Sequence, residues 1–432
     1  MSAPRQAHIR ALAQAARAAS RRLASSSRAE RDRALHRAAQ LLVEDAEAIL
    51  AANAADCAGA DIAPAARQRL KLDPAKLAEM ARGLEAVAAL PDPIGRVRLR
   101  RLLDEGLELT QVTCPLGVLA VVFESRPDAL VQIGALAIKS GNAALLKGGR
   151  EAAGSNALLA RALRRALAEA GLPEAAIQLL EGREDVEALL ALDDLVDLVI
   201  PRGSSALVRF IQSHTRIPVL GHAEGICHVY LDAAADPDKA VAIVADAKLQ
   251  YPAACNAAET LLAHRDAGPA LVRVAEALRA RGTRLRGCER SRALLPWLEP
   301  ATDQDWDTEY GEPTLAVRMV DSLDQAIEHI HAHGSGHTEA IVTEDPAAAE
   351  RFLAEVDAAG VYHNASTRFA DGYRYGFGAE VGISTGRLHA RGPVGLEGLL
   401  STRFLLRGQG QVVADYVGPQ ARSFLHRDLP LE

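Results

Sequence analysis

Hydrophobic positions in the first part of the chain recur with the period of an α-helix. Ile9, Leu12 and Ala16 share one helical face, and Ser27 with Glu30 forms an S-x-x-E capping box that opens a second helix. The alanine-rich helical pattern continues to about residue 90. The first 29 residues carry arginine and serine but no acid, as organelle transit peptides do, yet the helical period runs on past them. We therefore interpret this stretch as helices that cover a sheet.

After these helices the pattern changes to that of strands. Residues 97–112 mix β-branched and charged side chains around Gly106, which predicts a hairpin suited to an exposed ribbon or a subunit contact. Strand and helix signals then alternate, which predicts a parallel sheet that binds ligands at the carboxyl ends of its strands. The expected strands are 117–123, 143–147, 176–180 and 195–200, and the expected helices are 127–139, 155–170 and 184–192.

A second alternating series begins after Asp236 and predicts a second α/β domain. The last part of the chain alternates again around Leu405 and over 412–416, and should pair with the early hairpin or with a partner subunit. We therefore expect one domain over 1–235, interrupted by the hairpin 97–115, a second over 236–390, and a β ribbon formed by the hairpin and 391–432. The second series comprises helices over 237–249, 269–281 and 323–332 and strands over 259–264, 315–320 and 340–343.

Composition excludes several classes of protein. The 432 residues are 49% hydrophobic, enough for sizeable cores. A net charge of −7 and an aromatic content of 4% speak against a nucleic-acid partner. No apolar run approaches the roughly 18 to 20 residues that span a bilayer. The five cysteines are scattered without a C-x-x-C pair, which indicates a reducing, cytoplasmic setting and no metal or redox bridge.

Cys255 is the candidate nucleophile. It stands in YPAACNAAETLL, on a loop that follows a helix and precedes an apolar strand, at the junction of the two expected domains. A thiol becomes a nucleophile where backbone amides or cations favour its thiolate, and a junction loop can supply both. The alternative is a small buried apolar side chain, which is the role of most free cysteines.

Two strand ends could bind a nucleotide. The loop after the strand 195–200 places Gly203 and Ser204 where free amides can meet a pyrophosphate, although an ordinary N-capped turn fits equally well. Lys147 and Arg150 end another strand of the same sheet. Their cations could flank a ribose or a 2′-phosphate, or could be solvated surface charges.

Ser125 and Arg126 directly follow the core strand 117–123, at the sheet edge where a ligand would bind. The Ser125 hydroxyl could donate to an oxyanion, and the Arg126 guanidinium could bind a carboxylate or phosphate in a bidentate way. Each could also be only a turn residue.

Together the motifs carry a family resemblance. The segments ESRP, LLKGGREA, PRGSS, LGHAEGICHVY, YPAACNAAETLL, Glu309-Tyr310, GSGHTEAIVT and GAEVGISTGRLHARGPVGLEGL occur in this order. In this they resemble the gamma-glutamyl phosphate reductases, or glutamate-5-semialdehyde dehydrogenases, of the aldehyde dehydrogenase superfamily. The likeness covers nearly the whole chain. It implies an α/β fold with two Rossmann-like domains, nucleotide-binding over 1–235 and catalytic over 236–390, plus a small β oligomerisation ribbon.

The resemblance also implies residue roles. Cys255 would be the nucleophile, Lys147 and the Gly203-Ser204 loop would bind the nucleotide, and Glu309 would face the ribose on the nicotinamide side. We expect NADPH rather than NADH, because two cations, Lys147 and Arg150 in the KGGR segment, favour a 2′-phosphate.

Two positions depart from the superfamily pattern. Ser125 falls where aldehyde dehydrogenases carry an oxyanion-hole Asn, so the amide of Cys255 would supply more of that stabilisation. Leu220 takes the place of the general-base Glu found in the L-E-L-G-G stretch of hydrolytic members. The absence of a base that activates water suits an acyl group that is exchanged with phosphate. His222 or Glu224 could substitute for the base.

Two further features are weighed against plainer explanations. The histidines between His329 and His337 lack an accompanying acid or cysteine, so they indicate a helix C-terminus rather than a metal site. Arg387, inside ISTGRLH, is the candidate for a substrate carboxylate, with an ion pair at a subunit contact as the equal alternative.

The resemblance thus implies NADPH-dependent reduction of L-glutamyl 5-phosphate to L-glutamate 5-semialdehyde through a thioester, in proline biosynthesis. The enzyme would be a homo-oligomer, either a dimer or a tetramer. Two other hypotheses stay open. One is a hydrolytic NAD-dependent aldehyde dehydrogenase, which would work without phosphate. The other is a non-catalytic assembly scaffold.

Overall fold

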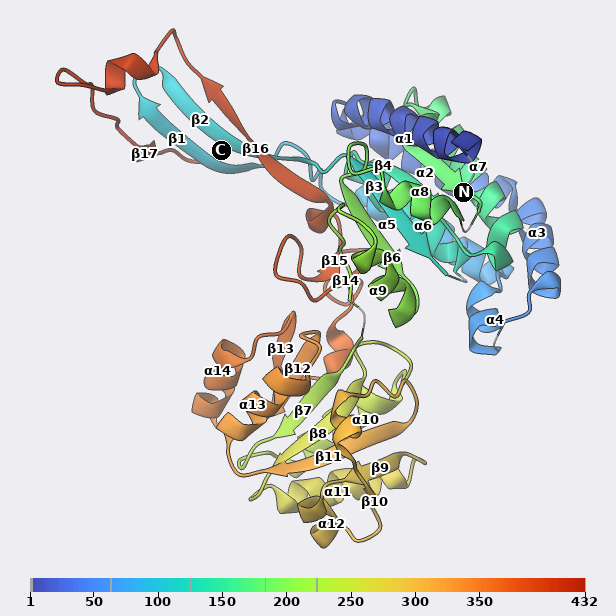
Figure 1. Cartoon of the computed structure of the whole chain (residues 1–432), viewed down its shortest axis with the longest axis vertical. Coiled ribbons are helices and arrows are strands. Elements are labelled where there is room, and N and C mark those ends of the chain that lie inside the picture. The colour runs from blue at the N-terminus through green and yellow to red at the C-terminus, as the bar shows by residue number, and fades with distance from the viewer. Residues whose placement is uncertain (1–2, 63, 125, 183, 223, 432) are drawn as a thin grey trace.

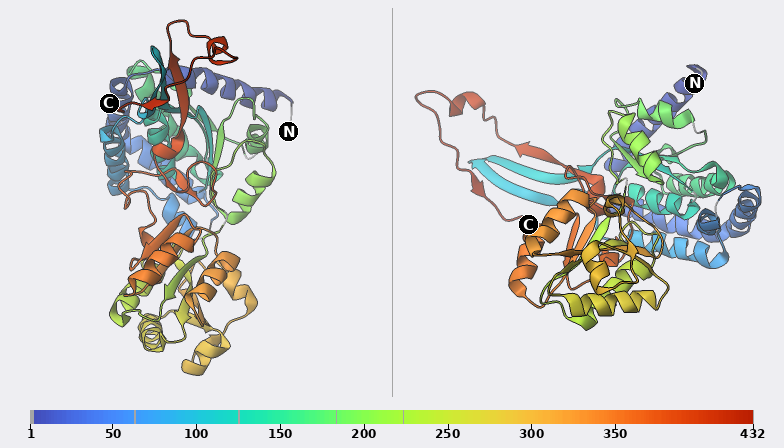
Figure 2. Two further views of the ribbon diagram at one scale, coloured as in Figure 1. Left: turned by 90° about the vertical axis from the view of Figure 1, so that its left-hand side faces the viewer. Right: turned by 60° about the horizontal axis from the view of Figure 1, so that its bottom comes forward.

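A computed structural model describes residues 3–62, 64–124, 126–182, 184–222 and 224–431. Figure 1 shows an N-terminal domain, a second α/β domain below it, and a β ribbon that projects away from both. The right-hand view of Figure 2 shows that the ribbon stands clear of the domains along most of its length. No helix in the described part of the chain is long and apolar enough to cross a membrane.

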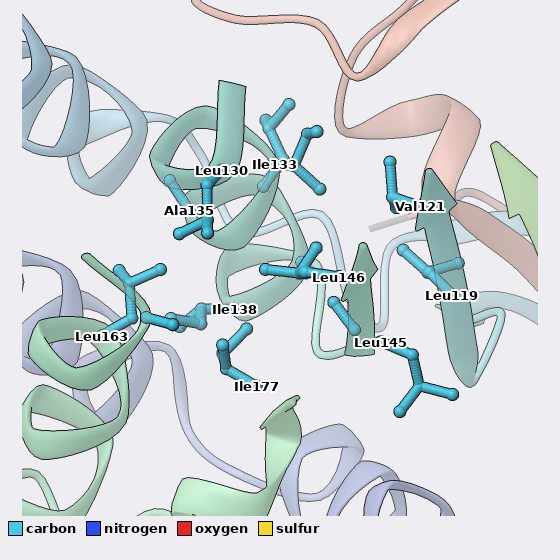
Figure 3. Close-up of a cluster of buried hydrophobic side chains, with 14 of the residues drawn as sticks. Leu119, Val121, Leu130, Ile133, Ala135, Ile138, Leu145, Leu146, Leu163 and Ile177 are labelled. Atoms are coloured by element: carbon cyan, nitrogen blue, oxygen red, sulfur yellow. The ribbon is translucent and has the colours of Figure 1, made fainter. Parts of the chain in front are cut away.

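The N-terminal domain is built on a parallel sheet with strand order β5-β4-β3-β6. Every side chain of β3 and β4 is buried, as expected for strands covered on both faces. Figure 3 shows Leu119, Leu146 and Ile133 in this core. The strands are β3 (Val118–Phe123), β4 (Ala143–Lys147), β5 (Ile177–Leu180) and β6 (Leu198–Arg202).

Helices surround this sheet. The predicted capping box is confirmed: Ser27 accepts from the Glu30 amide, and the Glu30 carboxylate accepts from the Ser27 amide. The first helix contacts β3, β4 and β5, whereas the helices after β3 and β4 pack on β4 and β5. The helices are α1 (Ala3–Ala24), α2 (Arg28–Glu44), α3 (Ala46–Gly59), α4 (Pro64–Leu70), α5 (Pro74–Ala89), α6 (Pro127–Lys139), α7 (Ala153–Glu169), α8 (Glu184–Leu190) and α9 (Ser205–Ser213).

The second domain is built on a parallel sheet with strand order β10-β9-β11-β8-β7-β12-β13. Side chains alternate between the two faces of a strand, so successive residues of β7 pack in different hydrophobic clusters. Val229 belongs to the cluster on one face of the sheet and Tyr230 to the cluster on the opposite face. The strands are β7 (Cys227–Leu231), β8 (Ala258–His264), β9 (Arg284–Gly287), β10 (Glu299–Pro300), β11 (Thr314–Val320), β12 (Thr338–Val342) and β13 (Gly360–His363). The helices are α10 (Pro237–Leu249), α11 (Gly268–Arg279), α12 (Glu289–Leu294), α13 (Leu323–His333) and α14 (Pro346–Glu355).

The ribbon is antiparallel, with strand order β16-β2-β1-β17. The expected hairpin turns at Gly106, whose φ of 69° favours glycine. The predicted strand around Leu405 pairs with this hairpin, whereas residues 412–416, also expected to be strand-like, contain the 3-10 helix Val413–Tyr416. The strands are β1 (Val97–Asp104), β2 (Leu107–Pro115), β16 (Leu400–Arg407) and β17 (Arg427–Asp428).

The domain boundary differs from the one expected. β7 pairs with β8 and β12, so it belongs to the second domain although it precedes residue 235. Asp236, after which the second domain was expected to begin, is the N-cap of the helix that follows β7. At the other end Val381, Val394 and Leu399 pack in the core of the N-terminal domain, with β14 (Gly382–Ser384) and β15 (Gly392–Val394) beside β6.

Candidate active site

Cys255 lies at the amino end of β8, on the edge of the second sheet that faces the N-terminal domain. The strand order β8-β7-β12 places the starts of three parallel strands side by side here. Gly225, just before β7, packs on the Cys255 backbone so closely that a Cβ there would lie 2.0 Å from the Cys255 carbonyl oxygen. The Cys227 thiol donates to that same oxygen at 3.4 Å. Backbone packing therefore fixes the loop and leaves Cys255 half-buried.

Two guanidinium groups act on the Cys255 sulfur from different domains. Burial, with the nearby Arg126, lowers the pKa of Arg202 at the end of β6, while Glu380 and the Cys255 sulfur favour its charged form. Burial also lowers the pKa of Arg368, and Cys255 again favours the charge. Both guanidiniums therefore place positive charge near the Cys255 sulfur.

The backbone around Cys255 also offers a donor. Among the described residues the Cys255 amide meets no acceptor, so its N–H is free to donate to an oxyanion. The neighbouring Asn256 is held in place by two hydrogen bonds. Its side-chain Nδ2 donates to the Ala370 carbonyl at 2.8 Å, and its backbone carbonyl accepts from the Thr367 hydroxyl. Ser125, the second expected oxyanion donor, lies outside the described residues.

A cavity of about 820 Å³ opens beside this loop. Arg126 lines it and donates to Asp128 at 2.9 Å. Burial disfavours the Asp128 charge, but Arg126 outweighs that effect and lowers its pKa. Cys255 does not line the cavity itself; Arg202 and Tyr251 do, and they connect the cavity to the thiol. The other charged lining residues are Arg69, Lys76, Glu79, Arg82, Asp371 and Glu380.

The expected nucleotide residues lie at the carboxyl ends of β4 and β6. Ser204 is the N-cap of α9, and its amide donates to the Glu124 carboxylate at 2.9 Å. The helix N-terminus therefore binds an anion in this structure. Lys147 is buried, which lowers its pKa, and its Nζ donates to the Gly148 carbonyl, whereas Arg150 is exposed.

Glu309 reaches the same junction from the second domain. Its Oε2 accepts from the Gly225 amide at 3.0 Å, and Gly225 in turn packs on Cys255. Beneath it Lys248 and Glu259 form an ion pair at 2.6 Å, both fully buried. Burial lowers the pKa of Lys248 and raises that of Glu259. The Gly311 amide donates to Glu259 at 3.4 Å, so the pair anchors the segment that carries Glu309.

The remaining candidates lie in different places. Arg387 forms an ion pair with Asp357 and lines another cavity, so the structure does not bring it to the cavity that Arg126 lines. Leu220 is buried in the N-terminal core. Of the two substitutes for the missing base, Glu224 pairs with Arg209, whereas His222 lies within 4.8 Å of Cys255.

Sequence reasoning missed the two cations at the thiol. Arg202 lies inside the quoted motif PRGSS, but only its neighbours were given roles. Arg368 was not singled out at all. No local signal could have found them, because Arg202 and Cys255 approach each other only across the domain junction.

The chain is similar to known proteins along most of its length. The family model described as "Aldehyde dehydrogenase family" matches residues 1–286. Gamma-glutamyl phosphate reductase of Synechococcus elongatus is 58% identical over 96% of this chain and 97% of its own length. The protein of the same name from a Cyanothece species is 57% identical, covering 97% of both chains. The crystal structure of gamma-glutamyl phosphate reductase from Thermotoga maritima, 40% identical, covers 94% of this chain and 99% of its own with a TM-score of 0.92. The resemblance seen in the motifs and the expected fold are confirmed.

Proposed function

The chain belongs to the gamma-glutamyl phosphate reductases of the aldehyde dehydrogenase family, and we propose that it reduces L-glutamyl 5-phosphate to L-glutamate 5-semialdehyde and phosphate with NADPH. The observation that carries the proposal is the half-buried Cys255 thiol at the junction of the two domains, close enough to Arg202 and Arg368 to interact with their charges.

The cavity suits an amino-acid acyl phosphate. Such a substrate carries an ammonium, a carboxylate and a phosphate. The lining offers both signs of charge, with Arg126 and Arg202 among the cations and Asp128 and Glu380 among the anions. Guanidiniums bind carboxylate and phosphate in a bidentate way, and carboxylates bind an ammonium. We assign Arg126 to the substrate because it lies at the cavity wall close to Arg202.

The N-terminal sheet fits a nicotinamide nucleotide. The Ser204 amide, which binds the Glu124 carboxylate, belongs to a helix N-terminus of the kind that binds pyrophosphate. Lys147 would bind the ribose, and Arg150, on the exposed side of that strand end, would favour a 2′-phosphate. Glu309 would bind the nicotinamide-side ribose from the second domain. When bound, the reduced nicotinamide supplies a hydride to the acyl carbon.

Cys255 performs the acyl chemistry in this proposal. Its thiolate attacks the acyl carbon, the carbon–oxygen bond to phosphate breaks, and phosphate leaves with that electron pair. The product is a thioester on Cys255. After hydride addition the Cys255 amide donates to the resulting oxyanion. Collapse of this thiohemiacetal breaks the carbon–sulfur bond, releases the aldehyde and restores the thiolate, near the positive charges of Arg202 and Arg368.

Hydrolysis is the competing activity, because His222 lies close to Cys255 and could activate water. Oxidation of glutamate semialdehyde distinguishes the two. A phosphorylating enzyme requires phosphate for turnover, whereas a hydrolytic one reduces the nucleotide without it. We expect no turnover when phosphate is omitted, and a higher kcat/KM with NADP than with NAD.

The nucleophile is tested with Cys255→Ser. We expect phosphate-dependent NADP reduction to fall to background while NADP binding, measured by calorimetry, persists. Cys288→Ser is the matched control, since Cys288 is also half-buried and also in the second domain, but lies at the start of α12 instead of before β8. Retained turnover in Cys255→Ser would refute the proposed role.

A further inference from the structure

Three side chains that are far apart in the sequence meet at the candidate nucleophile. One ring nitrogen each of His222 and His337 and the Sγ of Cys255 all lie within 4.8 Å of one another. The two imidazoles also contact edge to face, with ring centroids 4.9 Å apart. The cluster arises from the sheet order, because Cys255 precedes β8, His337 precedes β12, and the segment with His222 leads into β7 between them.

Each of the two imidazoles is held by a hydrogen bond at one of its two ring nitrogens. His222 Nδ1 is 3.0 Å from the Ile383 carbonyl, so this nitrogen carries the proton and Nε2 keeps a free electron pair. His337 Nδ1 is 2.9 Å from the Thr338 hydroxyl. A backbone carbonyl that orients a histidine through one nitrogen, leaving the other to bind, is typical of metal ligands.

The second ring nitrogen of His337 is a further indication of a bound ligand. His337 is only 1% exposed, and its Nε2 finds no hydrogen-bond partner among the described residues. A buried polar atom without a partner costs about 1–3 kcal/mol, so native proteins rarely keep one without a function. A bound ion at the cluster would satisfy this atom.

We propose that His222, Cys255 and His337 form an inhibitory zinc site. A thiolate with two imidazoles is a donor set that suits Zn²⁺ and not Mg²⁺ or Ca²⁺, which require oxygen. Tetrahedral Zn²⁺ needs its ligand atoms about 3.3–3.6 Å apart, so side-chain rotations that close the present separations by up to about 1.5 Å suffice. Binding replaces the thiol proton with zinc and removes the nucleophile. The inhibition rests on the proposed role of Cys255, whereas the binding does not.

Arg202 and Arg368 lower the affinity of this site for a metal cation. Both repel a second cation, so we expect Zn²⁺ to bind only through the ionised sulfur and to be displaced by a thiol chelator. This site was not predicted from the sequence, because the run from His329 to His337 contributes only one of its ligands.

The test uses the reduced full-length enzyme with Zn²⁺ at buffered concentrations, and Co²⁺ as a spectroscopic probe of thiolate ligation. We expect one metal per chain, a thiolate-to-cobalt charge-transfer band, and inhibition that a chelator reverses. His222→Ala and His337→Gln should each weaken zinc binding and zinc inhibition by more than about 10-fold, since even loss of an outer partner costs roughly 10–100-fold. His331→Ala, an exposed histidine of the same stretch, is the control.

The outcomes separate the two proposals. Zinc affinity unchanged in both His222→Ala and His337→Gln would overturn the site, and circular dichroism checks that the buried His337→Gln variant is folded. His222 is only half-buried, so its replacement keeps the test valid if His337→Gln does not fold. Zinc binding that requires all three residues but leaves turnover unchanged would uphold the site and refute Cys255 as the nucleophile.

Discussion

Replacing Lys248 with Met should destabilise the second domain more than the removal of any surface charge. Lys248 and Glu259 are fully buried and 2.6 Å apart. Removing the lysine leaves the Glu259 carboxylate buried without its cation. Breaking a buried pair in this way costs about 3–5 kcal/mol of unfolding free energy. With a urea m-value of about 2–3 kcal/mol/M, the unfolding midpoint should fall by roughly 1–2.5 M.

Tryptophan fluorescence measures the loss of stability in the second domain. The 2 tryptophans of the chain, Trp297 and Trp306, both lie in the second domain, so their emission reports its unfolding and not that of the N-terminal domain. Lys239→Met is the matched control, because Lys239 lies on the same helix and its pair with Glu344 is exposed. We expect no measurable shift from the control, since solvent screens such pairs.

A double variant tests the physical reason. Lys248→Met with Glu259→Leu removes both charges, so no unpaired charge stays buried, and most of the lost stability should return. The reasoning is refuted if Lys248→Met shifts the midpoint no more than Lys239→Met does. It is also refuted if the double variant is as unstable as the single one.

Three further predictions concern the thiol, the ribbon and a buried histidine. Arg202→Met should slow alkylation of Cys255 by anionic iodoacetate more than by neutral iodoacetamide, because it removes a positive charge near the sulfur, while Arg209→Met should not; equal effects on the two reagents would contradict the electrostatic assignment. Phe404 and Leu406 on β16 are 62% and 57% exposed, and we propose that this face is the subunit contact, so replacing both with Glu should lower the mass measured by light scattering; an unchanged mass would exclude this face as the contact. Burial, aided by His228, lowers the pKa of His329 to about 2, so only the unfolded state gains a proton as pH falls below about 6.5. The resulting loss of about 2–3 kcal/mol between pH 6.5 and 4.5 should disappear in His329→Gln, and an unchanged pH slope would contradict it.

Local patterns determined much of this protein. The capping box at Ser27 and Glu30, the hairpin around Gly106 and the alternating strands depend on hydrogen bonds and side-chain periods within a few residues. The strand-to-helix loop at Ser204 was predictable for the same reason. Cys255 could be singled out because its motif is continuous in the sequence.

Only the tertiary structure decided what surrounds Cys255. The order β8-β7-β12 brings together the starts of strands that are distant in the chain. It places His337 beside the Cys255 thiol and Gly225 against the Cys255 backbone. The junction of the domains adds Arg202 from the opposite sheet. Burial and charge at one point depend on every segment that packs there, so no single stretch of sequence contains them.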